Sequence, residues 1–247
     1  MKITIQAALF NVSHEYEEIL NNMMLKFCTA IRYSFKRLLE GLKIGDLEKD
    51  VAFKYELNIR QAKDAVESAR QTIQSQKELL KLNYNNYNKK VKRIEEELKN
   101  ENLSDKKRNA LIKKLEKRKL KLKYYHELID NNKIPPVIFG TKKMFLRRCK
   151  GLITIEEWKN CRNNRIYSRG DKTKKGNPNL RIIIKNHMTY LEISTLQKTE
   201  TKRAIKIQIP IYLPQKKSKK TGKINGNNYR EMFLNYLETN EAYQVEI

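Results

Sequence analysis

One stretch, from Val137 to Ile184, holds the residues whose types and spacing best suit the binding of a charged ligand. It contains thirteen lysines and arginines against three acids, with glycines and aromatic residues interleaved among the cations. Lysine and arginine neutralise phosphate charge, and glycine lets backbone amides approach a phosphate closely. This composition predicts a binding site for a polyanion. A solvated charged turn remains the alternative for the loop that contains Gly170 and Gly176.

Seventeen residues of this stretch and of a later lysine-rich loop are candidates for nucleic-acid contact. All carry a cationic group except one tyrosine, which could stack on a base, and one asparagine, which could form hydrogen bonds. They are Lys142, Lys143, Arg147, Arg148, Arg162, Arg165, Tyr167, Arg169, Lys172, Lys174, Lys175, Asn177, Arg181, Lys216, Lys217, Lys219 and Lys220.

Local signals indicate how the chain would position these residues. The β-branched and aromatic run Val137–Phe139 predicts a strand or an extended lead-in that Gly140 ends. The sequence Thr154-Ile155-Glu156-Glu157 is typical of a capping box, which predicts a helix running to about Ile166. A basic loop then leads to a predicted strand over Leu180–Ile184.

Tyr167 lies two residues from both Arg165 and Arg169, so an extended segment would put all three on one face. A ring flanked by cations is the arrangement that holds splayed RNA, through base stacking and phosphate contact. The alternative is that Tyr167 packs in the core while the arginines pair with Glu156 and Glu157.

The net charge favours a polyanionic partner. The 247 residues include 53 lysines and arginines against 28 acids, giving +25, and nucleic acid would relieve the resulting self-repulsion. An anionic membrane is the other candidate, but no apolar run approaches the roughly 20 residues of a spanning helix, and no signal-peptide pattern opens the chain. The cysteines, Cys28, Cys149 and Cys161, lack CxxC spacing. We therefore expect a cytoplasmic protein with neither a zinc ribbon nor a disulfide framework.

Hydrolytic chemistry finds no support in the sequence. His14, His126 and His187 lie far apart, and none has a second histidine at HxxxH spacing. No aspartate lies on an apolar strand, where the metal-binding carboxylates of a RuvC-type nuclease are needed, and no GxxxxGK[ST] phosphate loop occurs. We expect no catalytic residue, metal or cofactor within this chain.

The first 131 residues predict one strand followed by helices. Alternation over Lys2–Phe10 indicates a strand, and Ser13 can cap the helix after it. The region Asp46–Lys99 is helix-friendly throughout, but its apolar repeat slips by one residue after Leu80, which predicts a break or local unwinding around Lys81–Asn86. Ser104 can cap a return helix, completing an antiparallel hairpin.

The predicted hairpin is basic. Between Lys89 and Lys123 there are fifteen lysines and arginines against six acids. A solvated coiled coil with i,i+4 ion pairs, such as Glu95 with Lys99, is one interpretation. The excess of cations over acids is too large for internal pairing, so phosphate contact is the other interpretation.

The C-terminal part predicts an antiparallel sheet. Pro210 would place the strand Ala204–Leu213 at an edge or a bulge. The loop Pro214–Lys223 carries five lysines and is either a hairpin tip that grips phosphate or a solvated loop. The other expected elements are a strand over Thr189–Leu196, a short helix over Tyr229–Leu237 and a strand from Tyr243 to Ile247.

Two runs carry a resemblance to a known family. IFGTKKMF (138–145) and GLITIEEWKNCRNNRIYSRGDKTKKGNPNLRI (151–182), with the helical region before them, resemble the N-terminal half of the TnpB (OrfB) proteins of bacterial insertion sequences. Those proteins are relatives of the type V CRISPR effectors. The likeness is strongest over about residues 134–247 and diffuse over the helices.

The resemblance implies an α+β fold, in which a small antiparallel β-barrel of the wedge (OB-like) type is interrupted by a long helical-hairpin recognition insertion. Residues 1–12 and 134–247 would form the barrel, and residues 13–133 the recognition domain. Such a half binds guide RNA and target DNA duplex. Its catalytic site lies in a RuvC-type nuclease domain or chain outside these residues, where Mg²⁺ is expected.

Three hypotheses follow from the sequence. The first is the guide-RNA and target-DNA binding module of an RNA-guided DNA endonuclease, in which base pairing reads sequence and protein reads heteroduplex shape. The second is a stand-alone RNA- or DNA-binding protein, such as a nuclease-free repressor. The third is a basic coiled-coil structural protein. A RuvC-bearing partner chain would distinguish the first from the others.

Overall fold

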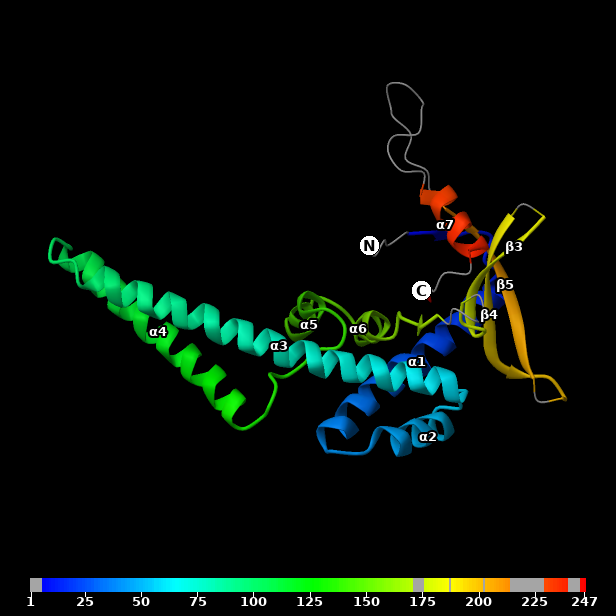
Figure 1. Ribbon diagram of the computed structural model, residues 1–247, viewed down its shortest axis with the longest axis horizontal. Helices are drawn as coiled ribbons and strands as arrows, with labels where there is room; N and C mark the ends of the chain where they lie inside the picture. The colour runs from blue at the N-terminus through cyan, green and yellow to red at the C-terminus, as the bar shows by residue number, and fades with distance from the viewer. Residues whose placement is uncertain (1–5, 171–175, 187, 202, 214–228, 240–244) are drawn as a thin grey trace, which may run out of the picture. The chain divides into compact units, whose positions relative to one another are not determined.

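A computed structural model describes residues 6–170, 176–186, 188–201, 203–213, 229–239 and 245–247 (Figure 1). Within these ranges the chain forms seven helices and antiparallel sheets of four and two strands, so the expected α+β class is confirmed. In chain order the elements are β1 (Ala8–Leu9), α1 (His14–Leu39), α2 (Ile44–Lys54), α3 (Ile59–Leu98), α4 (Asp105–Asp130), α5 (Lys142–Cys149), α6 (Ile155–Arg162), β2 (Tyr167–Ser168), β3 (Leu180–Lys185), β4 (Met188–Lys198), β5 (Ala204–Tyr212), α7 (Tyr229–Glu238) and β6 (Val245–Glu246).

The chain divides into two compact units. The first comprises residues 1–68 and 139–247, and the second comprises residues 69–138. Helices α1 and α2, which we expected in a helical insertion, therefore fall in the same unit as the sheet. The first turns of α3 belong to the first unit and the rest of α3 to the second.

Helix α1 begins and packs as its sequence predicts. The Ser13 hydroxyl accepts a hydrogen bond from the Tyr16 amide at 3.2 Å, and acids occupy the first turn, where they suit the positive end of the helix dipole. Met23, Phe27 and Ile31, spaced four residues apart, are buried on one face. This face supplies the helical part of the first unit's core.

A short separate helix, α2, follows where the sequence indicated one continuous helical region. Leu47 and Val51 are fully buried on it. Helix α3 then begins with a reciprocal cap: the Gln61 amide donates to Asn58 Oδ1 at 2.9 Å, and the Asn58 amide donates to Gln61 Oε1 at 3.1 Å. The small residue Ala62 on the first turn of α3 is fully buried, which permits close packing.

The four-stranded sheet has the order β1-β5-β4-β3. Leu180, Ile193 and Ile207 occupy matched positions on β3, β4 and β5, and all three are buried. The prediction that the N-terminal strand pairs with a strand beyond Pro136 is confirmed by β1, whose Ala8 lies opposite Tyr212. The first and last parts of this unit are thus joined by backbone hydrogen bonds.

Pro210 does not lie at the sheet edge, because β5 has β4 on one side and β1 on the other. The Phe10 amide donates to the Pro210 carbonyl at 3.2 Å, so the backbone groups of Pro210 face β1. Proline has no N–H to return to Phe10, which ends the β1–β5 ladder at this point. The expectation of an edge strand was wrong: Pro210 lies on an inner strand, at the point where the β1–β5 hydrogen bonds end.

Strands β2 and β6 form the separate two-stranded sheet, in which Tyr167 lies opposite Glu246 and Ser168 opposite Val245. The described strands form open sheets, and they do not close into a barrel. The run at residues 137–139, expected as a strand or an extended lead-in, is not a strand and has no strand partner among the residues that the structure covers.

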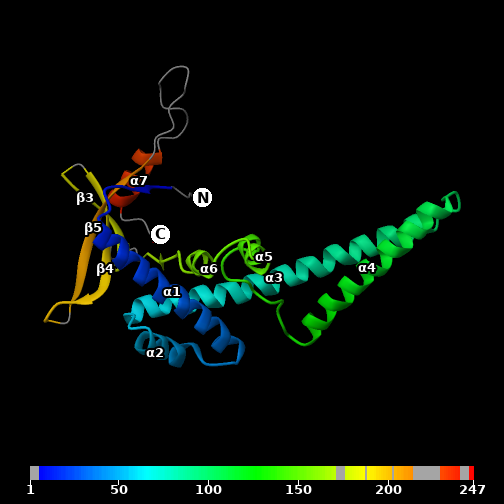
Figure 2. The same ribbon diagram turned by 180° about the vertical axis from the view of Figure 1, so that it is seen from behind.

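The second unit is an antiparallel hairpin of α3 and α4, as expected (Figures 1 and 2). Leu80, Val91 and Ile94 of α3 and Leu111 of α4 are buried along its seam. Ser104 occupies the N-cap position of α4, but its hydroxyl forms no cap hydrogen bond, so the expected side-chain cap is absent here.

The predicted break at Lys81–Asn86 was wrong, because α3 is one helix of 40 residues. The slip in its apolar repeat has another cause. The buried residues of its first turns, such as Val66, belong to the first unit, whereas Val91 and Ile94 belong to the hairpin seam. The helix keeps its geometry while the face that it buries changes.

Candidate nucleic-acid interface

Helix α5 presents the first group of candidate cations. It was not expected as a helix, but the Thr141 hydroxyl caps it by accepting from the Met144 amide at 3.2 Å. Lys142, Lys143 and Arg147 are exposed on it. Arg148, another candidate, is half-buried, and its guanidinium donates to the Ile153 carbonyl at 3.4 Å. Three of the four cations are therefore free to meet a ligand.

Helix α6 begins with the predicted capping box. The Glu157 amide donates to Thr154 Oγ1 at 3.1 Å, and the Thr154 amide donates to Glu157 Oε2 at 2.7 Å. The helix ends at Arg162 rather than near Ile166. The chain is extended at Ile166, where backbone hydrogen bonds of 3.0 Å join it to Ile247 in both directions. The backbone of Ile166 is therefore paired with the C-terminal segment and does not continue helix α6.

The Trp158 ring of α6 packs against α5 and against the segment that precedes α5. Its ring centroid lies 5.9 Å from that of Phe145, and the Arg162 guanidinium carbon lies 5.7 Å from the Trp158 centroid. Gly140 has φ +88°, and a Cβ there would meet the Trp158 ring and Arg162 Cγ at 3.1 Å. The positive φ favours glycine at this position, and a Cβ there would also be tightly packed against the Trp158 ring.

The α5–α6 surface combines these cations with exposed apolar side chains. Phe145 is 38% exposed, Leu146 46%, Leu152 62% and Ile155 47%. A ring beside cations can stack on a base while the cations neutralise phosphate. We call the surface formed by Lys142, Lys143, Phe145, Leu146 and Arg147 the α5 patch.

Helix α1 fixes the segment that follows α6. The Arg32 guanidinium donates to the Arg162 carbonyl and to Asn163 Oδ1, both at 2.8 Å, and the Cys28 thiol donates to the Arg165 carbonyl at 3.1 Å. Burial, followed by the nearby Arg162 charge, lowers the pKa of Arg32 from its usual value. Arg162 is itself half-buried, and its Nε is buried without a hydrogen-bond partner. Arg32 and Arg162 therefore hold this part of the protein in place and are not free to contact a ligand.

Tyr167 is half-buried on β2. Its burial is therefore intermediate between that of an exposed stacking surface and that of a core residue, the two predicted alternatives. The Arg165 guanidinium lies 5.7 Å from its ring centroid, so these two residues share a face as the extended spacing predicted. Arg165 also pairs with Glu246, at 2.7 Å from Nε and 3.2 Å from Nη2, rather than with the acids of α6. Arg169 is exposed.

A buried polar network, which the sequence did not reveal, holds the turn after β2. Asp64 of α3 is only 4% exposed, and its Oδ2 accepts from Ser168 Oγ at 3.5 Å and from Asn177 Nδ2 at 3.4 Å. Burial raises the pKa of Asp64 to about 6, although Arg169 opposes the shift. An aspartate in the buried stripe of α3 was the available signal.

The Asn177 side chain is fully engaged in this network. It is 1% exposed, its Nδ2 donates to the Arg169 carbonyl at 2.8 Å, and its Oδ1 accepts from the Asn179 amide at 2.9 Å. Its side chain therefore positions the Arg169 backbone and does not face a ligand.

Arg181 is likewise committed to the protein. It lies opposite Glu192 in the sheet, with Nε and Nη2 at 2.9 and 2.8 Å from Glu192 Oε1. Lys206 and Gln208 also donate to this carboxylate, at 2.9 and 3.0 Å. Glu192 is 6% exposed, and these hydrogen bonds lower its pKa against the opposing effect of burial, which is the largest single influence. The four residues form one polar row across three strands.

Seven candidates lie outside the residues that the structure describes: Lys172, Lys174, Lys175, Lys216, Lys217, Lys219 and Lys220. Of the ten others, the exposed cations are those of the α5 patch together with Arg165 and Arg169. Within the ranges that the structure covers, no three His, Cys, Asp or Glu residues gather as metal ligands would. No helix there is long and apolar enough to cross a membrane.

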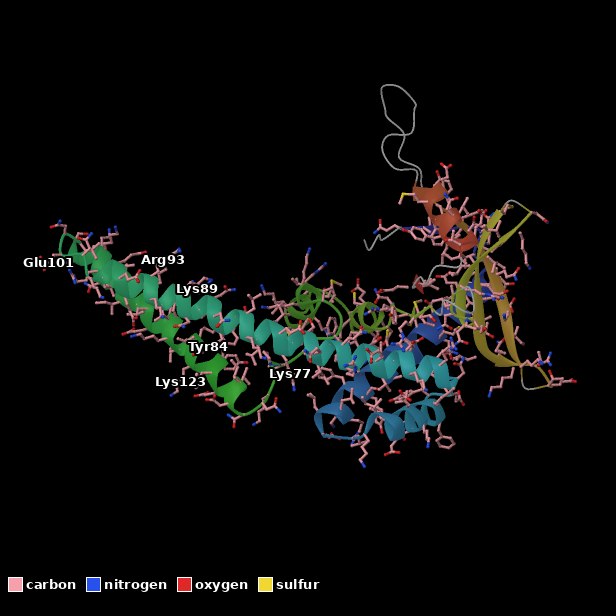
Figure 3. The ribbon with its side chains drawn as sticks, in the orientation of Figure 1. Lys77, Tyr84, Lys89, Arg93, Glu101 and Lys123 are labelled. Atoms are coloured by element: carbon pink, nitrogen blue, oxygen red, sulfur yellow. The ribbon has the colours of Figure 1, made fainter. Side chains whose placement is uncertain are left out.

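The hairpin carries the second concentration of cations. Figure 3 shows Lys89 and Arg93 along α3 and Lys123 on α4. Among the lysines of the hairpin, Lys119 pairs with Glu95 at 2.7 Å and Lys123 with Glu127 at 4.0 Å. Most of the basic excess is therefore displayed to solvent.

Comparison with known proteins gives one family. No curated protein and no solved structure matches the chain. A family model matches residues 2–247, which is nearly the whole sequence. The chain belongs to the family described as the SSO2105 N-terminal domain.

Proposed function

We propose that this chain is the guide-RNA and target-DNA binding module of an RNA-guided DNA endonuclease of the TnpB type. The resemblance over residues 138–145 and 151–182 motivates the assignment. A RuvC-type nuclease domain or chain outside these residues would supply cleavage together with its Mg²⁺. The exposed cations of the α5 patch, together with Arg165 and Arg169, would bind and position nucleic acid.

The observation that carries the proposal is the α5 patch. It presents three exposed cations, Lys142, Lys143 and Arg147, and the exposed ring of Phe145 on one short helix, in a chain with a net charge of +25. Phosphate contacts of this kind position a nucleic acid without reading its sequence. A guide RNA that pairs with DNA supplies the sequence reading itself, so a protein surface of cations and stacking groups is sufficient.

The sheet pairing supports the same proposal. A barrel interrupted by a helical insertion needs its N-terminal strand to pair with strands that follow the helices. β1 and β5 pair in that way. We infer that the four-stranded and two-stranded sheets correspond to parts of the wedge-type barrel.

Charge-matched double substitutions test the assignment. Lys143→Ala with Arg147→Ala removes two cations from the α5 patch, whereas Lys43→Ala with Lys49→Ala removes two exposed cations near α2. The RNA that copurifies with the chain is the ligand, and affinity is measured against salt. The α5 pair should weaken binding at least about fivefold and reduce the salt slope by about 2, while the α2 pair changes affinity less than about twofold.

Equal effects of the two pairs would contradict a localised site and leave only non-specific charge attraction. A stand-alone nucleic-acid-binding protein is the alternative outcome. It would bind RNA through the α5 patch, but the bound RNA would not direct it to complementary DNA.

A further inference from the structure

A groove runs along one face of the hairpin in the second unit. Its volume is about 830 Å³, within the roughly 300–1,000 Å³ typical of clefts that bind small organic ligands. It is lined by Tyr87, Ala110, Lys113, Lys114, Lys117, Arg118, Leu120, Lys121 and Tyr124. We call it the hairpin groove. No acid contributes to its lining.

Helical spacing produces the cationic lining. Lys113, Lys117 and Lys121 recur every four residues along α4, so their Cα atoms advance about 6 Å each along one face. Ala110 and Tyr124 lie on the same face at its two ends. A row of this kind can follow a phosphate backbone.

The lining cations differ from others on the same helix. Lys119 and Lys123, which do not line the groove, pair with Glu95 and Glu127. Within the part of the chain that the structure describes, no acid lies within ion-pair distance of the five groove cations. A solvated coiled-coil face would be expected to neutralise itself with i,i+4 acids. The unneutralised row indicates an external anion.

Aromatic rings line the same groove and are held in place. The Tyr125 centroid lies 5.4 Å from those of both Tyr87 and Tyr124, which links the rings across the hairpin. Arg118 stands 5.4 Å from the Tyr87 centroid, and Lys121 stands 5.2 Å from that of Tyr124. Because the rings are supported from behind and flanked by cations, they can accept a base without first being ordered.

Exposed apolar groups in the groove also favour a ligand that carries a base. Tyr124 is 37% exposed and Leu120 is 68% exposed, whereas among the residues of α4 only Leu111 is buried. An acidic protein surface would satisfy the cations but would leave the rings without a stacking partner. An unpaired nucleotide satisfies both, since its phosphate meets a cation and its base meets a ring.

We propose that the hairpin groove binds single-stranded nucleic acid, with an unpaired base stacked on Tyr124 and the flanking phosphates on Lys113, Lys117 and Lys121. This inference rests on the proposed nucleic-acid-binding function, and it adds a second site and a preference for unpaired strands. RNA and DNA share the chemistry that the groove recognises, so the experiment must distinguish them.

The test uses the full chain and strands of about 12 nucleotides, a length within the range that single-strand sites cover. Single-stranded RNA and DNA of the same sequence, each with 2-aminopurine at its centre, are compared with an RNA duplex. The variants are Tyr124→Leu, Tyr124→Phe and Lys113→Ala with Lys117→Ala. The charge-matched control is Lys119→Ala with Lys123→Ala. Far-UV circular dichroism confirms that each variant keeps its helices.

Tyr124→Leu should weaken single-strand binding by about 5- to 140-fold, the range expected for loss of one base stack, and should abolish 2-aminopurine quenching. Tyr124→Phe should retain both affinity and quenching, because the ring remains. The groove lysine pair should weaken binding at least about fivefold more than the control pair does. The strand, RNA or DNA, that shows the greater loss identifies the preferred ligand.

Three results would overturn the proposal. They are duplex affinity equal to single-strand affinity, unchanged quenching in Tyr124→Leu, and tighter binding to phosphatidylserine vesicles than to either strand. If the whole chain binds copurifying RNA through the α5 patch while every groove variant behaves as wild type, the groove inference fails and the proposed function stands. If the wild-type chain binds no nucleic acid, both fail.

Discussion

Replacing Asp64 with asparagine should make the first unit less sensitive to pH. Asp64 is 4% exposed, and burial raises the pKa of its carboxyl from 3.8 to about 6. The folded chain therefore holds this proton more tightly than the unfolded chain does. Its contribution to stability is fully present below pH 3.8 and is lost as the pH rises through about 6.

The magnitude follows from the shift. A difference of about 2 units corresponds to roughly 3 kcal/mol of lost stability once Asp64 is fully ionised in both states. Between about pH 5 and about pH 7.5, linkage assigns about 1.4 kcal/mol of that loss to Asp64. Asparagine keeps an oxygen that can accept from Ser168 and Asn177 but does not titrate. The stability of Asp64→Asn relative to wild type should thus grow by about 1.4 kcal/mol over this range.

Urea unfolding followed by the fluorescence of Trp158, the one tryptophan of the chain, measures this change within the first unit. Glu101→Gln, at the exposed turn between α3 and α4, is the control and should show no pH-dependent difference. A stability difference between Asp64→Asn and wild type that stays constant with pH would refute the reasoning. So would a variant that becomes less stable at about pH 7.5, because the ionised carboxylate would then be a required acceptor.

Three other predictions concern the same surfaces. If about 8 phosphates are neutralised, log K for RNA should fall with log salt at a slope of roughly −6 to −7, and a slope near zero would exclude electrostatic binding. Gly140→Ala should lower the free energy of unfolding by about 1–3 kcal/mol, because its φ is +88° and its Cβ would meet Trp158; an unchanged urea midpoint would contradict this. Arg181→Ala should destabilise the sheet by about 1–3 kcal/mol, since Glu192 loses its cross-strand partner, and should leave RNA affinity per folded molecule unchanged. A loss of affinity without a loss of stability would place Arg181 in the interface.

Features set by neighbouring residues could be predicted from the sequence. The Ser13 cap and the Thr154–Glu157 capping box depend on groups within one turn, and both occur as expected. Strand β5 follows from its apolar alternation, which buries Ile207, Ile209 and Ile211 on one face. In these cases local chemistry and the tertiary fold favour the same structure.

Features set by distant residues could not be predicted. The Asp64 network joins residues 64, 168 and 177, and the Glu192 row joins three strands, so neither leaves a local pattern. The predicted break in α3 was wrong because a change of buried face resembles a helix end when the packing partners are unknown. Helix α5 was missed because its two turns are too short for a periodic pattern and its first turn lacks acids.

Within the candidate interface, residue type predicted which side chains could bind anions but not which were already engaged. Asn177 and Arg181 have suitable chemistry, yet their groups are used inside the protein. Lys143, Arg147 and Arg169 remain exposed. Exposure depends on the assembled fold and cannot be derived from spacing along the chain.

RNA-directed DNA binding is the most direct test of the proposed function. The RNA that copurifies with the chain is sequenced, and the RNA–protein complex is offered duplex DNA that is complementary to the RNA or scrambled. We predict one discrete RNA species and binding to the complementary duplex that is at least about tenfold tighter, since pairing supplies the sequence reading. Heterogeneous RNA, with equal binding to both duplexes, would contradict an RNA-guided module.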